Sequence, residues 1–277
     1  MPRAEYDAIA ALNISRLKAI KRSPQHYRHA LDNPPEKSCL TLGNATHVGV
    51  LEPERYMNDF AVWTRRTEAG KAAPRNGKWW DEFQLANPNK TILTYDENAL
   101  AYEIAAAVRF NPIANKYLAE GEPEVTLEWT LDAALLTRPA KGRVDWLTHI
   151  DGQPYLVGLK TARNCAHFAF GSQAAKLGYH LQWAYYFDGF KAIRGREPKM
   201  IEIVVESEAP FAVAVYRIEK DLIEQGREEY WEAAKILAEC EERDEWPGPV
   251  PAEEALTLPS WAYHQDDDLS EIGLETA

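Results

Sequence analysis

The spacing of hydrophobic and polar positions changes along the chain, and its first fifty residues read as helices. Residues 11–31 carry apolar side chains at helical intervals in two short segments. Asn13 and Ser23 stand where they can cap these helices, because short polar side chains accept hydrogen bonds from a first turn's free N–H groups. Residues 40–51 show a third helical segment, which Pro53 ends. We therefore expect a compact helical start.

The next segments are less regular. Residues 60–95 have few periodic apolar positions, so we expect loops with one weak strand over residues 60–64. Residues 96–119 return to helical spacing and predict a single helix. Later in the chain, residues 174–193 and 222–243 predict two long helices.

Strands are expected in the centre of the chain, where apolar and polar residues alternate. Two of them are joined by Asp151-Gly152, a dipeptide typical of a two-residue hairpin turn. The expected strands cover residues 124–131, 142–150, 153–161, 201–207 and 211–218. Helices mixed with antiparallel strands predict a mixed α/β core.

Composition narrows the class of protein. With 277 residues and 45% hydrophobic content, the chain can bury a sizeable core. We expect one domain over residues 1–264 and an acidic, disordered tail over residues 265–277. No stretch is apolar enough to predict a signal peptide or a membrane span. The three cysteines lie far apart, which fits a reducing compartment and excludes a four-cysteine cluster.

A net charge of −12 does not exclude DNA binding, because the local distribution of charge decides it. Basic residues gather over residues 16–29 and again over residues 65–78. The predicted DNA contacts from the second group and the tryptophan after it are Arg65, Arg66, Lys78 and Trp79. A solvated surface is an equally good interpretation of either group alone.

The hairpin carries the candidate chemistry. A tip at residues 151–152 sets position 145 opposite 158 and position 143 opposite 160, so that all four side chains project from one face. Two carboxylates at 145 and 158 could share a divalent cation, with Lys160 beside it. Position 158, however, is glycine. Taken alone, a surface hairpin with one aspartate and one lysine is the better interpretation.

An ordered set of motifs changes that balance. The chain resembles the RecE-type exonucleases, which are represented by the C-terminal nuclease of exodeoxyribonuclease VIII, and more distantly lambda exonuclease. The motifs run through nearly the whole chain: Ser15, Ser23-Pro24 and Tyr27; residues 42–47 and 51–54; Glu124 with Trp129; residues 141–145, 159–162 and 179–182; Tyr185-Tyr186; residues 245–247 and 258–262. This resemblance implies a restriction-endonuclease-like PD-(D/E)XK core, a mixed central sheet flanked by helices.

The resemblance also implies roles for individual residues. His47, Asp145 and the backbone carbonyl of Leu159 would bind the metal, and Lys160 would be the catalytic lysine. Glu124 would orient water or a second metal, with Glu128 as a rival on the same strand face.

Three further residues complete the implied site. Gln182 and Tyr186 lie four apart on one helix face, and the resemblance places such a pair beside the active site and DNA. Arg143 is a further expected DNA contact.

Gly158 departs from the family pattern, because active relatives carry Asp or Glu there as a metal ligand. Three explanations stay open: a deliberate replacement, a natural inactive or weakened variant, or substitution by another acid such as Glu124 or Glu128. The cofactor implied is Mg²⁺, with Mn²⁺ as a substitute.

The resemblance implies 5′–3′ exonuclease action on linear double-stranded DNA. The product would be 3′ overhangs for a RecT-type single-strand annealing protein, and activity would be weakened or absent because of Gly158. It further implies a ring of three or four subunits, encoded by a phage or prophage and working in the bacterial cytoplasm. The alternative is a catalytically inactive DNA-binding or assembly protein that keeps the fold.

Overall fold

The computed structural model describes residues 3–33, 41–133, 136–250 and 252–257. Its helices are α1 (Arg3–Ala8), α2 (Ile14–Arg22), α3 (Pro24–Asp32), α4 (Thr41–Leu51), the 3-10 turn η2 (Pro53–Arg55), α5 (Tyr56–Asp59), α6 (Lys78–Ala86), α7 (Tyr95–Phe110), α8 (Pro112–Leu118), α9 (His167–Leu177), α10 (Tyr179–Arg194) and α11 (Lys220–Arg243). Its strands are β1 (Phe60–Trp63), β2 (Thr91–Thr94), β3 (Glu122–Ala133), β4 (Leu136–Ile150), β5 (Gln153–Ala162), β6 (Lys199–Glu206) and β7 (Val213–Ile218). The predicted tail lies outside the described residues.

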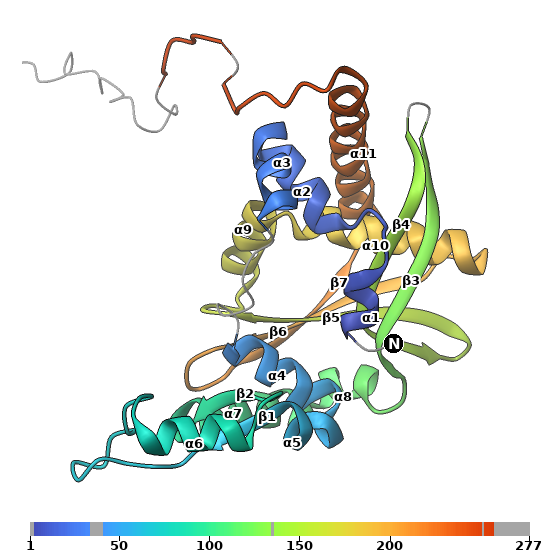
Figure 1. The fold of residues 1–277 in the computed structure, drawn as a ribbon. Coiled ribbons are helices and arrows are strands. Elements are labelled where there is room, and N and C mark those ends of the chain that lie inside the picture. The colour runs from blue at the N-terminus through green and yellow to red at the C-terminus, as the bar shows by residue number, and fades with distance from the viewer. Residues whose placement is uncertain (1–2, 34–40, 134–135, 251, 258–277) are drawn as a thin grey trace, which may run out of the picture.

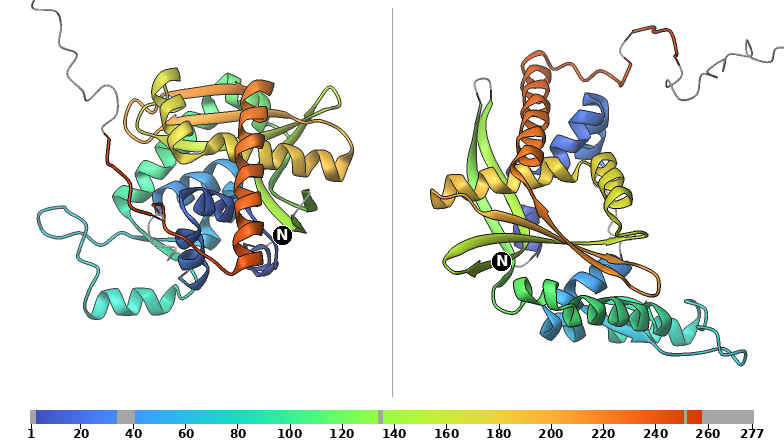
Figure 2. Two further views of the ribbon diagram at one scale, coloured as in Figure 1. Left: turned by 90° about the horizontal axis from the view of Figure 1, so that it is seen from above. Right: turned by 180° about the vertical axis from the view of Figure 1, so that it is seen from behind.

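The central sheet has the order β3-β4-β5-β6-β7, with β5 and β6 parallel and the other neighbours antiparallel. Helices α2, α3, α9, α10 and α11 cover one face, and α4, α7 and α8 cover the other (Figures 1 and 2). Each face has its own apolar core, since alternate strand residues point to opposite sides. The mixed α/β core predicted from the pattern is confirmed.

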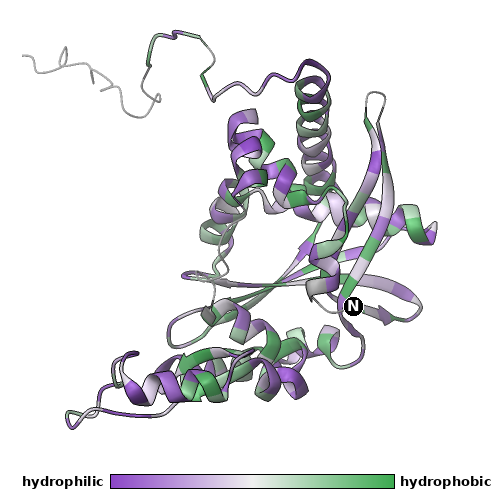
Figure 3. Cartoon of the chain, in the orientation of Figure 1, coloured by the Kyte–Doolittle hydropathy of each residue, from purple (hydrophilic) through white to green (hydrophobic). Residues whose placement is uncertain are grey.

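The predicted helix caps at the start of the chain are confirmed. The Asn13 side chain accepts a hydrogen bond from the Arg16 N–H at 3.1 Å, and Ser23 accepts one from the His26 N–H at 3.2 Å. Pro24 occupies the first turn of α3, where a missing N–H costs nothing. The helical surface mixes hydrophilic and hydrophobic residues, as α11 shows along its length (Figure 3).

Two predicted helices are each divided in the structure. The expected helix over residues 96–119 becomes α7 and α8, because Asn111 turns to an extended conformation before Pro112 and caps α8. The expected helix over residues 174–193 is interrupted at Gly178, whose φ of 63° is left-handed. Glycine adopts that conformation without strain, so one helix ends there and α10 starts in a new direction.

The segment expected to consist of loops contains more regular structure. Helix α6 and strand β2 both lie within residues 60–95, and β2 pairs in parallel with the predicted strand β1. Both strands are only four residues long, so alternation in β2 was too brief to recognise. The buried side chains Phe60 of β1 and Leu93 of β2 pack against Ala45 and Val48 of α4. This small sheet therefore supports α4.

The predicted hairpin turn is confirmed. Asp151 and Gly152 have φ values of 50° and 75°, as a turn of this handedness requires. Ile150 pairs with Gln153, and the ladder continues to Trp146 and Val157. The expected pairs 145–158 and 143–160 lie beyond the last pair of the ladder, so the strands separate where the candidate chemistry begins.

Candidate active site

Separation of the two hairpin strands leaves Asp145 free to turn toward the lysine strand. One carboxylate oxygen, Oδ2, accepts the Leu159 N–H at 2.8 Å and lies 3.4 Å from the Lys160 ammonium. Burial opposes ionisation of Asp145, but Lys160, His47 and the Leu159 N–H outweigh it and hold the pKa of this carboxyl below its ordinary value. Asp145 is therefore an anion held in a fixed orientation.

Glu124 reaches the same place from strand β3. It falls between the Pro123–Trp146 and Val125–Val144 pairs, and its φ is 53°. A left-handed glutamate inside a strand is strained and is found mostly where function fixes it. This conformation breaks the alternation that would have kept Glu124 and Glu128 on one face. Glu128 is exposed and lies outside the cluster, while Glu124 forms an ion pair with buried Arg143.

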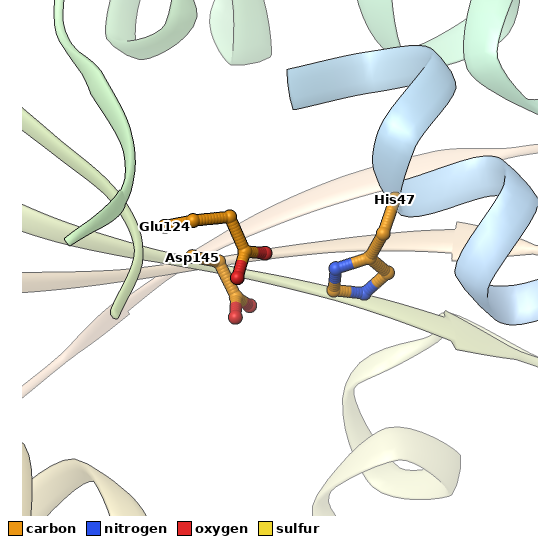
Figure 4. Close-up of side chains that lie close together, drawn as sticks. All are labelled: His47, Glu124 and Asp145. Carbon is orange, nitrogen blue, oxygen red and sulfur yellow. The ribbon is translucent and has the colours of Figure 1, made fainter. Parts of the chain in front are cut away.

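His47 completes the group from the opposite side of the sheet. Ligand atoms of His47, Glu124 and Asp145 all lie within 4.8 Å of one another, and Figure 4 shows the three side chains converging from α4, β3 and β4. Burial lowers the pKa of His47, so the imidazole is neutral and can offer a lone pair. Helix α4, predicted from the sequence, therefore delivers its histidine to the strand carboxylates.

These donors fit a divalent cation. Carboxylate and carbonyl oxygens suit Mg²⁺ and Mn²⁺, and a neutral imidazole adds a nitrogen donor. The backbone of Leu159 hydrogen-bonds with His47, and its carbonyl lies 3.3 Å from the Lys160 ammonium, so it faces the same space. The four donors named from the sequence thus occupy one location.

Lys160 remains a cation in this site. Burial alone would lower its pKa, but the neighbouring Asp145 and Glu202 carboxylates outweigh burial and raise it well above the ordinary value. Its ammonium lies 3.4 Å from Asp145 and 3.3 Å from Glu202. A permanently charged lysine can stabilise developing negative charge, and it cannot serve as a general base.

Glu202 is the acid that sequence reasoning missed. It lies in β6 beside Gly158, and its side chain is only 1% exposed. A Cβ built on Gly158 would lie 2.5 Å from Glu202 Oε1. Its place inside the apolar run 200–205 was the available signal, since an unpaired glutamate is almost never fully buried. Burial raises the pKa of Glu202, although Lys160 opposes that rise.

Gln182 and Tyr186 line the same region from α10. The Gln182 side chain donates a hydrogen bond to the Tyr186 hydroxyl at 3.2 Å. Both border a cavity of about 20 Å³ that also touches Asp145, Lys160 and Glu202. That volume holds about one water molecule. Gln182 and Tyr186 thus share a cavity with the candidate site residues, and their role there stays a prediction.

One basic residue of the segment 16–29 also approaches the site. Lys18 and Lys160 place their ammonium groups 5.4 Å and 5.6 Å from the centre of the Tyr179 ring. Burial and the charge of Lys160 lower the pKa of Lys18 to about 8. A second ammonium therefore lies close enough to that of Lys160 for the two charges to interact.

The predicted DNA contacts are distributed differently. Trp79 is 60% exposed on α6, with the Arg65 guanidinium 4.7 Å from its ring centre. Arg66 pairs with Asp96, and Lys78 lies 3.9 Å from Glu82. Arg143, in contrast, is only 8% exposed and forms an ion pair with Glu124. The segment 65–79, which carries these residues apart from Arg143, lies at the edge of the layer that contains α7 (Figure 1). Its contact with DNA stays a prediction.

Part of the resemblance concerns residues 258–262, which lie outside the described residues.

Among the helices described, none is long and apolar enough to pass through a membrane. Within the described chain, Cys165 and Cys240 are free and buried.

Comparison with known proteins agrees with this fold. A crystal structure of a candidate exonuclease from Eubacterium rectale superimposes with a TM-score of 0.62 at 15% identity, covering 94% of this chain and 95% of the other. A phage-related exonuclease from Haemophilus somnus gives only 0.35 at 9% identity, covering 85% and 96%, which is too weak to support an argument. None of the curated proteins matches.

The likeness to the Eubacterium rectale protein bears on the fold alone, because the sequence identity is low. The family model described as a PDDEXK-like domain of unknown function (DUF3799) matches residues 13–256, which is most of the chain and includes every residue of the site. The restriction-endonuclease-like core expected from the motifs is therefore confirmed, and the chain belongs to this PDDEXK-like family.

Proposed function

We propose that this chain is a divalent-metal-dependent exodeoxyribonuclease. It would digest linear double-stranded DNA in the 5′–3′ direction and leave 3′ single-stranded overhangs for recombination. The observation that supports the proposal is the convergence of His47, Glu124 and Asp145 within 4.8 Å, beside a largely buried Lys160, in a PDDEXK-like fold.

The side chains divide the chemistry between them. His47, Asp145 and the Leu159 carbonyl would hold Mg²⁺ or Mn²⁺, with Glu124 adjacent. When bound, such a cation activates water and neutralises charge on a phosphate. Lys160 would stabilise the negative charge that develops as water attacks phosphorus and the bond to the leaving oxygen breaks. Arg143 would hold Glu124 in its strained conformation, because the two form an ion pair.

Substrate contacts would come from two places. Lys18 lies close enough to Lys160 for the two charges to interact, so it could neutralise a phosphate near the cleaved bond. The exposed Trp79 and Arg65 could contact a longer stretch of DNA through stacking and phosphate binding. The polarity of digestion, a RecT-type partner and a ring of three or four subunits rest on the family resemblance.

An inactive DNA-binding protein is the second candidate, because Gly158 lacks the expected carboxylate. The strained Glu124 and the largely buried Lys160 argue against it, since both are costly arrangements that binding alone would not need. Activity of the unaltered chain separates the two candidates.

The test uses linear duplex DNA labelled at either 5′ end or 3′ end, incubated with the full chain and Mg²⁺. We expect early release of the 5′ label, retention of the 3′ label, and no digestion in EDTA or of closed circular DNA. Early release of the 3′ label would refute the polarity. If the chain binds DNA in the presence of Mg²⁺ and Mn²⁺ but never cuts it, the nuclease proposal is refuted. The inactive DNA-binding protein then remains as the function.

A further inference from the structure

We propose that Glu202 supplies the carboxylate that position 158 lacks, so that the second acid of the centre has moved from β5 to the neighbouring strand β6. The inference rests on the proposed function and deepens it, because it assigns a further ligand to the same centre. Three independent features of the structure support it: register, contacts and steric exclusion.

The strand register places Glu202 beside the gap. Gly158 pairs with Glu202, and Lys160 pairs with Val204, along the parallel strands β5 and β6. Partners across a ladder project from the same face, as do residues two apart on one strand. Gly158, Lys160 and Glu202 therefore share one face of the sheet, and the Glu202 side chain extends over the backbone of Gly158.

Contacts then hold the carboxylate toward the centre. Oε1 lies 3.3 Å from the Lys160 ammonium, whose other carboxylate neighbour is Asp145 at 3.4 Å. Oε2 accepts a hydrogen bond from the Trp183 indole N–H. Oε1 accepts no hydrogen bond in good geometry among the described residues, although it is fully buried. An oxygen in that state retains capacity to bind a cation.

Steric exclusion explains why the glycine and the glutamate occur together. A Cβ on residue 158 would lie 2.5, 2.6 and 2.8 Å from Oε1, Oε2 and Cδ of Glu202. Atoms cannot approach so closely, so a side chain at position 158 would displace the Glu202 carboxylate from its present position. In the structure, the carboxylate of Glu202 occupies the space beside Gly158.

The decisive experiment moves the acid back to β5. Four chains are compared: the unaltered protein, Glu202→Gln, Gly158→Asp, and the double variant Gly158→Asp/Glu202→Gly. Mn²⁺ affinity is measured by electron paramagnetic resonance without DNA, and nuclease activity is measured on linear duplex with Mg²⁺. Circular dichroism melting follows the fold of each chain.

We expect each single variant to lose at least tenfold in Mn²⁺ affinity and about 10²-fold in nuclease rate. Glu202→Gln loses the charge while keeping the shape. Gly158→Asp introduces a side chain that displaces the Glu202 carboxylate from its place beside Lys160. The double variant should recover both quantities to within about tenfold of the unaltered protein, because it provides one acid on the same face of the sheet without a clash.

Glu206→Gln is the matched control. Glu206 lies on the same strand, and its carboxylate accepts the Cys165 N–H at 3.1 Å, away from Lys160. Its substitution removes an equal charge from β6 and should change neither Mn²⁺ affinity nor rate.

The outcomes separate this inference from the proposed function. If the unaltered chain cuts DNA and Glu202→Gln keeps both its rate and its Mn²⁺ affinity, Glu202 is a structural partner of Lys160 and the inference fails alone. If the unaltered chain never cuts DNA, the nuclease proposal fails, and Mn²⁺ affinity decides the role of Glu202. A double variant that folds, melts normally and does not recover Mn²⁺ affinity also overturns the inference.

Discussion

Replacing Asp145 with asparagine should reduce DNA cleavage by at least about 10²–10³-fold, since loss of a cation's charge stabilisation costs several kcal/mol and each 1.36 kcal/mol is tenfold in rate. Asparagine can keep the hydrogen bond from the Leu159 N–H but loses the negative charge. The readout is the initial rate of duplex digestion together with Mn²⁺ affinity, and both should fall.

Asp132→Asn is the control for this substitution. Asp132 is an exposed carboxylate on β3 that accepts a hydrogen bond from Thr137 at 2.7 Å. Its substitution should leave cleavage unchanged. An Asp145→Asn chain that still binds Mn²⁺ and cleaves at the original rate would remove Asp145 from the centre.

Substitution of Lys160 by glutamine should have a different signature. We expect the maximal rate to fall by roughly 10²–10³-fold, as when one stabilising donor is removed from a developing anion. Mn²⁺ affinity should persist or increase, because the ammonium no longer competes for Asp145 and Glu202. Single-turnover cleavage and Mn²⁺ titration measure the two effects separately.

The control is Lys199→Gln, which removes an exposed lysine of β6 and should change neither quantity. If Lys160→Gln lost Mn²⁺ affinity as completely as Asp145→Asn, the lysine would be organising the metal ligands. Its assignment to charge stabilisation would then be wrong.

Local rules were enough to locate most of the site. The Asp151-Gly152 turn fixed which strands pair, so Asp145 and Lys160 could be placed together from the sequence alone. The helix of His47 was also predicted from the sequence. That this helix packs near the two strands came only from the family resemblance, because residues 47 and 145 are far apart in the sequence.

Other features depended on tertiary contacts. The sequence of hydrophobic and polar residues does not indicate the left-handed conformation of Glu124. Strand alternation therefore predicted the same face for Glu124 and Glu128 and could not decide between them. Glu202 was missed because the parallel pairing of β5 with β6 has no local signal, unlike a hairpin. Of the two substitutes considered for position 158, Glu124 lies in the cluster with His47 and Asp145, and Glu128 does not.

The structure also changes what restoring an acid at position 158 should do. From the sequence, Gly158→Asp would fill a gap and increase activity. With Glu202 already occupying that volume, the same substitution should decrease it unless Glu202 is removed as well. If Glu202 is the second acid, Gly158 does not favour an inactive protein.

The central claim is that His47, Asp145 and the Leu159 carbonyl form one metal centre. Anomalous diffraction from crystals of the full chain soaked in Mn²⁺ tests it most directly. The account predicts a strong peak bonded to the imidazole of His47 and the carboxylate of Asp145. Crystals that give no peak there, or a peak only at surface carboxylates, would contradict it.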